Sequence, residues 1–274
     1  MSSPRTPPSA RASHGSSSRV RVDVWLASAA SAPRASLDVW LGWLTPEERI
    51  AHGRFATESL RREWLVTRAL SRWSLSRWIY GVDPAAWRFE RTSAGRPFVV
   101  DPCEAPDFNL TNADGLVACA VSTARVGVDV EPVARGEELL ENAERLFSER
   151  ENADLRALPA HRRARRAVEL WTLKEAWLKA IGDGIAVRLS RFSLVPESEK
   201  DGAERSRFRA CEAVLGEDPA GWQLEVTPVD ANGSAEGYVL AVAVRRDRDA
   251  FVDVRTSEGL DGAAPLGVTG MSRG

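Results

Sequence analysis

Lysine is nearly absent from this sequence. Of the 37 basic residues only Lys174, Lys179 and Lys200 are lysine, and the other 34 are arginine. Because lysine ordinarily ranks among the commonest residues, the simplest explanation is a coding habit that uses arginine wherever a generic positive charge suffices. The positions that keep lysine are therefore informative, since a compact ammonium and a planar guanidinium are not chemically interchangeable.

Cysteine and long apolar runs are also scarce. Cys103, Cys119 and Cys211 form no CxxC pair and are odd in number, which argues against a disulfide framework or a cysteine zinc site. Residues 1–19 are rich in Ser, Pro, Ala and Arg and contain no apolar core of a secretion signal. No apolar run approaches the roughly 18 residues of a membrane span. We expect a cytoplasmic protein with no membrane partner.

Neither sign of charge dominates. The chain has 37 basic and 39 acidic residues, a formal net charge of −2, and 43% hydrophobic residues. This composition is ordinary for a globular protein and excludes extensive disorder. A dedicated nucleic-acid binder would usually be strongly basic, so we expect no nucleic-acid partner.

The hydrophobic pattern predicts an α+β fold in two similar halves. A strand at 20–26 precedes a long amphipathic helix at 61–80, and strands at 116–121 and 126–130 precede a second long helix that ends near 181. The same order of strand, helix and strands thus occurs twice. The predicted segments are a disordered tail at 1–19, an N-terminal half at 20–125, a C-terminal half at 126–255 and a flexible tail at 256–274.

The first chemical motif is Gly127-Val128-Asp129-Val130-Glu131-Pro132. Side chains two apart on a strand share a face, so Asp129 and Glu131 would lie side by side while the valines enter the core. Such like charges repel, and Mg²⁺, which prefers carboxylate and phosphate oxygens, would offset the repulsion. The alternative is a solvated strand end whose two acids have no function.

The second motif is Trp171-Thr-Leu-Lys174-Glu175-Ala-Trp-Leu-Lys179. On a helix Glu175 and Lys179 are neighbours, and the simplest interpretation is a solvated salt bridge. Against it, two of only three lysines fall within six residues of each other. Because an ammonium can approach a phosphate as a point charge or release a proton, the alternative is a functional role for this helix.

Together these motifs resemble the paired signatures of the 4′-phosphopantetheinyl transferases, in particular the larger surfactin-synthetase type. The resemblance extends over about residues 20–245 and includes further motifs in the same order. These are Arg54-Phe55 with the arginine-rich helix after it, Gly95-Arg96-Pro97, Phe108-Asn-Leu-Thr-Asn112 and Phe147-Ser-x-x-Glu151.

The resemblance implies two halves, each a small antiparallel sheet packed on a long helix, with coenzyme A and Mg²⁺ in the cleft between them. It implies transfer of the phosphopantetheine arm of coenzyme A to a serine of an acyl or peptidyl carrier protein, with release of adenosine 3′,5′-bisphosphate. We expect the protein to be a monomer. Asp129, Glu131 and Glu175 would bind the metal, and Glu175 or Glu131 would accept the serine proton. Lys179, with Lys174 nearby, would stabilise the departing phosphate.

The resemblance also implies that the first half of the chain binds coenzyme A. The residues expected to contact it are Arg54, Arg62, Arg72, Arg96, Thr111 and Asn112. Asn112 replaces the usual histidine of the family and cannot carry its charge. Glu48 and Ala51 stand where some relatives have lysines, so one of the first three arginines is expected to bind the 3′-phosphate.

Two other classes of function remain open at this point. A non-catalytic coenzyme A or nucleotide-binding module would not need the acidic residues, so Asp129→Ala would leave its ligand affinity nearly unchanged in Mg²⁺. A nucleic-acid-binding protein would show steeply salt-dependent binding, which the net charge disfavours.

Overall fold

The computed structural model of this chain describes residues 19–102, 104–182, 188–197, 205–214, 216–230, 237–247 and 252–260. Most of the two expected tails, and Lys200, lie outside these ranges. None of the helices in the described part combines the length and the apolar character that a membrane crossing requires.

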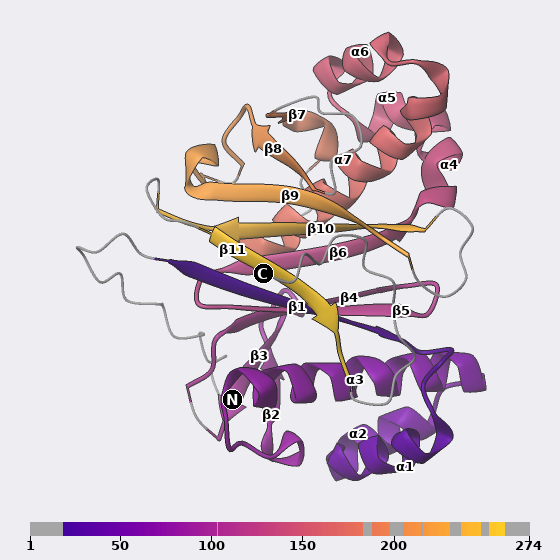
Figure 1. Ribbon diagram of the computed structural model, residues 1–274, viewed down its shortest axis with the longest axis vertical. Coiled ribbons are helices and arrows are strands. Elements are labelled where there is room, and N and C mark those ends of the chain that lie inside the picture. The colour runs from indigo at the N-terminus through magenta and orange to yellow at the C-terminus, as the bar shows by residue number, and fades with distance from the viewer. Residues whose placement is uncertain are drawn as a thin grey trace, which may run out of the picture.

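The first sheet has the strand order β11-β1-β5-β4. Its strands are β1 (Val20–Ser28), β4 (Asp107–Ala113), β5 (Leu116–Ser122) and β11 (Val252–Glu258). Helices α1 (Arg34–Trp43), α2 (Pro46–Gly53) and α3 (Glu58–Trp78) lie at the outer side of this sheet (Figure 1), near the 3-10 helix η1 (Pro84–Ala86) and the small hairpin of β2 (Arg88–Arg91) and β3 (Pro97–Asp101).

Local sequence signals explain where helices α2 and α3 begin. Thr45 caps α2 in a capping box with Glu48, and Thr57 caps α3 by accepting from the Leu60 amide. The apolar side of α3, with Leu65 and Leu70, is buried in one cluster with the outward-facing residues of β5.

The second sheet has the order β6-β10-β9-β8-β7 and is antiparallel. Its strands are β6 (Val126–Pro132), β7 (Leu194–Pro196), β8 (Ser206–Ala210), β9 (Trp222–Val229) and β10 (Tyr238–Arg245). The helical elements of this half are α4 (Gly136–Glu141), α5 (Ala143–Leu146), α6 (Glu149–Ala157), the long α7 (Ala160–Ile181), and the 3-10 helices η2 (Val133–Arg135), η3 (Leu189–Arg191) and η4 (Pro219–Gly221).

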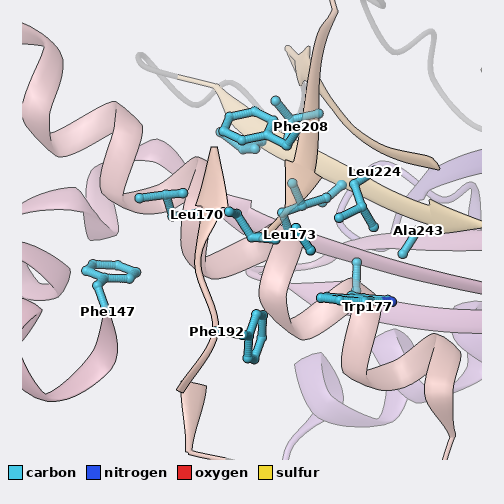
Figure 2. Packing of buried hydrophobic residues seen from close by; sticks show 14 of the residues in the cluster. Phe147, Leu170, Leu173, Trp177, Phe192, Phe208, Leu224 and Ala243 are labelled. Carbon is cyan, nitrogen blue, oxygen red and sulfur yellow. The ribbon is translucent and has the colours of Figure 1, made fainter. Parts of the chain in front are cut away.

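Helix α7 packs on this second sheet through large side chains. Leu173 and Trp177 of α7 belong to one buried cluster with Leu224 and Ala243 of the sheet (Figure 2). Trp177 also contacts Phe192 edge to face, with the ring centroids 5.4 Å apart. These residues are almost completely buried. Their packing fixes the rotation of α7 about its own axis and therefore which of its residues remain outside the core.

The two sheets face each other across a second apolar layer. Valines and leucines of β1 and β5 share one buried cluster with those of β6 and β10. The order of layers is therefore α3, first sheet, second sheet and α7 (Figure 1). This arrangement confirms the predicted α+β fold of two similar halves, each with a small sheet on a long helix.

Strand β11 departs from the expected antiparallel sheet and from the expected division of the chain. It pairs with β1 in parallel, from Val20 opposite Val252 onward. Val252 and Val254 are buried with the valines of β1, so this last described strand completes the first sheet. Its first four residues fall in the predicted second half and residues 256–258 in the predicted flexible tail, because a strand's partner depends on tertiary contacts and not on its own composition.

Candidate active site

A cavity of about 310 Å³ lies where β4, β6 and α7 meet. Six of the residues selected from the sequence line it: Thr111, Asn112, Asp129, Glu131, Glu175 and Lys179. The first two come from the N-terminal half and the other four from the C-terminal half. The tertiary fold thus brings the two sequence motifs and part of a third into one site.

Gly127 allows α7 to lie directly on β6. A Cβ atom at this position would be 2.0 Å from the carbonyl oxygen of Ala176 and 2.5 Å from the amide nitrogen of Ala180. Both distances are far below van der Waals contact, so a side chain here would push the helix away. The close approach places Glu175 and Lys179 beside Asp129.

Side chains of β4 join the edges of the two sheets. Asp107 accepts a hydrogen bond from the amide of Val126 at 2.8 Å, and Asn109 accepts one from the amide of Val128 at 3.0 Å. Two residues further along, the Thr111 hydroxyl donates to Asp129 Oδ1 at 2.8 Å. Because alternate residues of a strand share a face, one row of polar side chains both connects the sheets and brings Thr111 into the site.

Asp129 is buried and lines the cavity. Its Oδ1 accepts from Lys179 Nζ at 2.6 Å as well as from Thr111, and Lys179 Nζ also donates to the Thr111 hydroxyl at 3.1 Å. Its Oδ2 is buried and has no hydrogen-bond donor within the described part of the chain. A buried carboxylate oxygen without a donor is costly, which marks this atom as a point where a ligand would bind.

Glu131 is held from two sides. Its Oε1 accepts from Arg135 Nη1 at 2.6 Å and from the indole nitrogen of Trp171 at 3.0 Å, and the Arg135 guanidinium lies 5.6 Å from the centre of the Trp171 ring. The sequence analysis assigned no role to Arg135 or Trp171. Arg135 follows Glu131 by four residues and reaches it because η2 turns the chain after β6, whereas Trp171 is 40 residues away in the sequence.

The pKa of Glu175 is raised above its ordinary value. Burial is the largest cause, and the negative charges of Asp129 and then Glu131 add to it, while Lys179 and Arg135 act in the opposite direction. The carboxylate of Glu175 is therefore a better proton acceptor than that of an ordinary surface glutamate.

The three predicted metal ligands, Asp129, Glu131 and Glu175, all line this cavity. Within the described ranges, however, no group of three or more His, Cys, Asp or Glu side chains is arranged so that it could hold a metal ion. Ion pairs account for part of this, since Lys179 engages an oxygen of Asp129 and Arg135 engages an oxygen of Glu131. The chemistry of the oxygen set, with the unpartnered Asp129 Oδ2, nevertheless suits a hard divalent cation.

Lys174 does not belong to the site, and the expectation that it lies beside a phosphate is wrong. Its side chain is fully buried on the opposite side of α7, where its ammonium pairs with Glu151 at 2.7 Å. It also donates to the carbonyl oxygens of Leu189 and Phe192, both at 2.6 Å. Glu151 in turn belongs to a capping box with Ser148 at the start of α6, which the pattern Ser-x-x-Glu indicates.

The arginines expected to bind a 3′-phosphate have three different environments. Arg72 is completely buried and pairs with Glu48 at 2.5 Å, so it is not available to a ligand. Arg62 donates to the carbonyl oxygen of Ala32. Arg54 is exposed at the C-terminal end of α2. Of the three, Arg54 alone is an exposed cation, and the expectation for Arg72 is wrong.

Asn112 and Arg96 also have partners within the protein. The Asn112 side-chain amide donates to Glu63 of α3, a contact that the sequence did not indicate. Arg96 is held by acceptors of β4, β6 and α7, which leaves its two terminal nitrogens engaged inside the fold. The expectation that Arg96 binds a phosphate is therefore not supported by its contacts.

Comparison with known proteins places the chain in a family. A model of the 4′-phosphopantetheinyl transferase superfamily matches residues 125–243. The chain is 35% identical over 146 residues to the 4′-phosphopantetheinyl transferase HetI of a Nostoc species, covering 52% of this chain and 61% of that one. It is 30% identical over 157 residues to the 4′-phosphopantetheinyl transferase Sfp of Bacillus subtilis, covering 56% of this chain and 67% of that one.

Two further comparisons are more limited. The chain spans 50% of the length of another Bacillus subtilis 4′-phosphopantetheinyl transferase, at 32% identity. The crystal structure of the Thermotoga maritima holo-[acyl-carrier-protein] synthase aligns with a TM-score of 0.35 and 21% identity, covering 46% of this chain and 64% of that one. On the sequence matches, this chain belongs to the 4′-phosphopantetheinyl transferase superfamily.

Proposed function

We propose that this chain transfers the 4′-phosphopantetheine arm of coenzyme A to a serine of an acyl or peptidyl carrier protein and releases adenosine 3′,5′-bisphosphate. The observation that carries the proposal is the single cavity in which Thr111, Asp129, Glu131, Glu175 and Lys179 meet. The names of the relatives support the same activity. A non-catalytic binding module would have no need for a half-buried carboxylate with a raised pKa beside two further acids.

The reaction requires a base for the serine proton and a positive group that stabilises the negative charge on the departing phosphate. The serine oxygen forms a bond to the phosphorus that carries the pantetheine arm, the bond from this phosphorus to the bridging oxygen breaks, and the leaving bisphosphate keeps the electron pair. Glu175 accepts the serine proton, because its pKa is raised and, among the residues that the structure describes, no hydrogen-bond donor holds it as Arg135 and Trp171 hold Glu131. Glu131 then serves as a fixed negative charge.

Lys179 supplies the positive charge. Its side chain is 32% exposed and faces the cavity, while hydrogen bonds to Asp129 and Thr111 hold its ammonium. A preorganised cation stabilises the charge that develops on the departing phosphate more strongly than a mobile one, since it needs no reorganisation during the reaction.

Magnesium fits the oxygen atoms of this cavity. Asp129, through its unpartnered Oδ2, together with Glu131 and Glu175 would hold it. When bound, Mg²⁺ would neutralise charge on the pyrophosphate of coenzyme A.

The molecule that acts is proposed to be a cytoplasmic monomer. Residues from both halves of one chain line the cavity, an arrangement that is compatible with a monomer. The scarcity of cysteine is compatible with a reducing compartment. Coenzyme A would be contacted on the first half by Arg54 and at the cavity by Thr111 and Asn112.

Intact mass spectrometry of carrier proteins tests the activity. The chain is incubated with coenzyme A, Mg²⁺ and a panel of fatty-acid, polyketide and peptide-synthetase apo-carriers, and the mass of one phosphopantetheine arm should be added to at least one of them. A carrier whose acceptor serine is replaced by alanine is the control for the site of addition. Glu175→Gln should abolish most of the transfer. If coenzyme A binds but no carrier gains mass, the binding module is the better description.

A further inference from the structure

Arg96 makes contacts that are unusual for a residue expected to bind a ligand. It precedes β3, and its side chain is only 13% exposed. One terminal nitrogen, Nη2, donates to Asp107 at 2.7 Å and to the carbonyl oxygens of Val126 at 2.9 Å and Phe108 at 3.3 Å. The other, Nη1, donates to the carbonyl oxygens of Lys179 and Ala180. One guanidinium therefore connects β4, β6 and the end of α7.

The last turn of α7 depends on such contacts. The final four carbonyl groups of a helix have no partner within the helix. Here Leu178 accepts from the amide of Gly182 at 3.0 Å, and Ile181 accepts from Arg125 Nη2 at 2.7 Å. Lys179 and Ala180 accept from Arg96. Two arginines from outside the helix thus bind three of these carbonyls, and their positive charge also suits the negative end of the helix dipole.

We propose that Arg96 is a positioning residue that anchors the last turn of α7 to the first half and thereby holds Lys179 at the cavity, instead of binding a phosphate of coenzyme A. Lys179 is then held at both ends, with its carbonyl bound by Arg96 and its ammonium bound by Asp129 and Thr111. The effect on turnover rests on the proposed function, whereas the anchoring of the helix does not.

The two roles of Arg96 predict different kinetics. A positioning residue acts on the geometry of the reacting groups, where a misplacement of about 1 Å costs roughly 100-fold in rate. Arg96→Met should therefore lower kcat about 10- to 100-fold and change the KM for coenzyme A by less than about threefold. A phosphate ligand would show the reverse pattern, a KM raised more than about tenfold with kcat nearly unchanged, and that result would overturn the proposal.

Arg163→Met is the matched control. Arg163 donates from Nε to the carbonyl oxygen of Leu158 at 2.9 Å and from Nη2 to that of Arg156 at 2.8 Å, so it holds the end of α6 in the same manner. No residue of α6 lines the cavity. This variant should lose these two hydrogen bonds and keep the wild-type kcat.

Hydrogen–deuterium exchange measures the anchoring directly. In Arg96→Met the amides of residues 179–182 should exchange faster than in the wild type, while those of α3 and of residues 164–172 should not change. Unchanged exchange at 179–182 would overturn the proposal even if no carrier is modified. A wild-type chain that modifies no carrier contradicts the proposed function instead, and the exchange experiment remains decisive for Arg96.

Arg96→Lys covers the case in which the methionine variant does not fold. A lysine binds phosphate well as a point charge but cannot reach acceptors on three elements with one planar fork. The positioning role predicts that kcat falls in Arg96→Lys as well. Wild-type kcat and wild-type exchange at 179–182 in this variant would contradict it.

Discussion

Lys174→Arg should destabilise the protein although it preserves the charge. The three N–H donors of the Lys174 ammonium have three acceptors, one carboxylate oxygen of Glu151 and the carbonyl oxygens of Leu189 and Phe192, at 2.6–2.7 Å. The side chain is completely buried. Arginine would introduce a larger planar group with five donors into this space, and at least one donor would have no acceptor.

The magnitude follows from two costs. Overfilling a well-packed core costs about 1–3 kcal/mol, and an unsatisfied buried donor costs about 1–3 kcal/mol more, so the free energy of unfolding should fall by about 2–6 kcal/mol. For a chain of this size that corresponds to a melting temperature lower by roughly 4–24 °C. Burial also lowers the pKa of Lys174, whereas Glu151 raises it, so the net effect of this environment is to disfavour the charged form of the side chain.

Urea unfolding followed by tryptophan fluorescence measures this change, and Lys179→Arg is the matched control. Lys179 is on the same helix, but its side chain is 32% exposed at the cavity. Its replacement should change stability by less than about 1 kcal/mol and lower the transfer rate roughly 10- to 100-fold. A Lys174→Arg variant within about 1 kcal/mol of the wild type would refute the reasoning, as would equal losses of stability in both variants.

Three further results are expected. Because the pKa of Glu175 is raised, the apparent pKa of the acidic limb of the kcat/KM profile should lie above the ordinary glutamate value of about 4.3. Arg135→Gln should raise this apparent pKa further, because Arg135 lowers the pKa of Glu175. Gly127→Ala should reduce the free energy of unfolding by about 3 kcal/mol or more, as measured in urea, whereas Gly42→Ala, whose Cβ would meet no atom within 4 Å, should be neutral or stabilising. Burial raises the pKa of Glu225, so stability is lost as the pH rises above about 4.3, and Glu225→Gln should unfold at a higher temperature than the wild type at pH 7 but not at pH 4. An equal difference at both pH values would contradict this last expectation.

The part of the site that the sequence predicted consists of local geometry. Asp129 and Glu131 are two apart on a strand, and Glu175 and Lys179 are four apart on a helix, so their common faces follow from the repeat of the backbone alone. The structure places all four at one cavity. Thr111 was identified only through the resemblance, since a single threonine in a strand has no distinctive spacing.

The environments of the arginines could not be predicted from the sequence. Arg72 and Arg96 stand in motifs that suggested phosphate binding, yet the first is paired with Glu48 and the second with carbonyl oxygens of three other elements. Whether a guanidinium faces solvent or the interior depends on which acceptors the fold brings to it. Those acceptors lie up to 84 residues away in the chain.

Lysine, the scarce residue, shows the same division. The sequence by itself determined that Lys174 and Lys179 are special positions, because arginine is used almost everywhere else. It also determined the α+β fold and the two acidic motifs through hydrophobic period and spacing. Only the tertiary structure decided that Lys179 faces the cavity whereas Lys174 is enclosed with Glu151, because burial and ion pairing depend on residues that are distant in sequence.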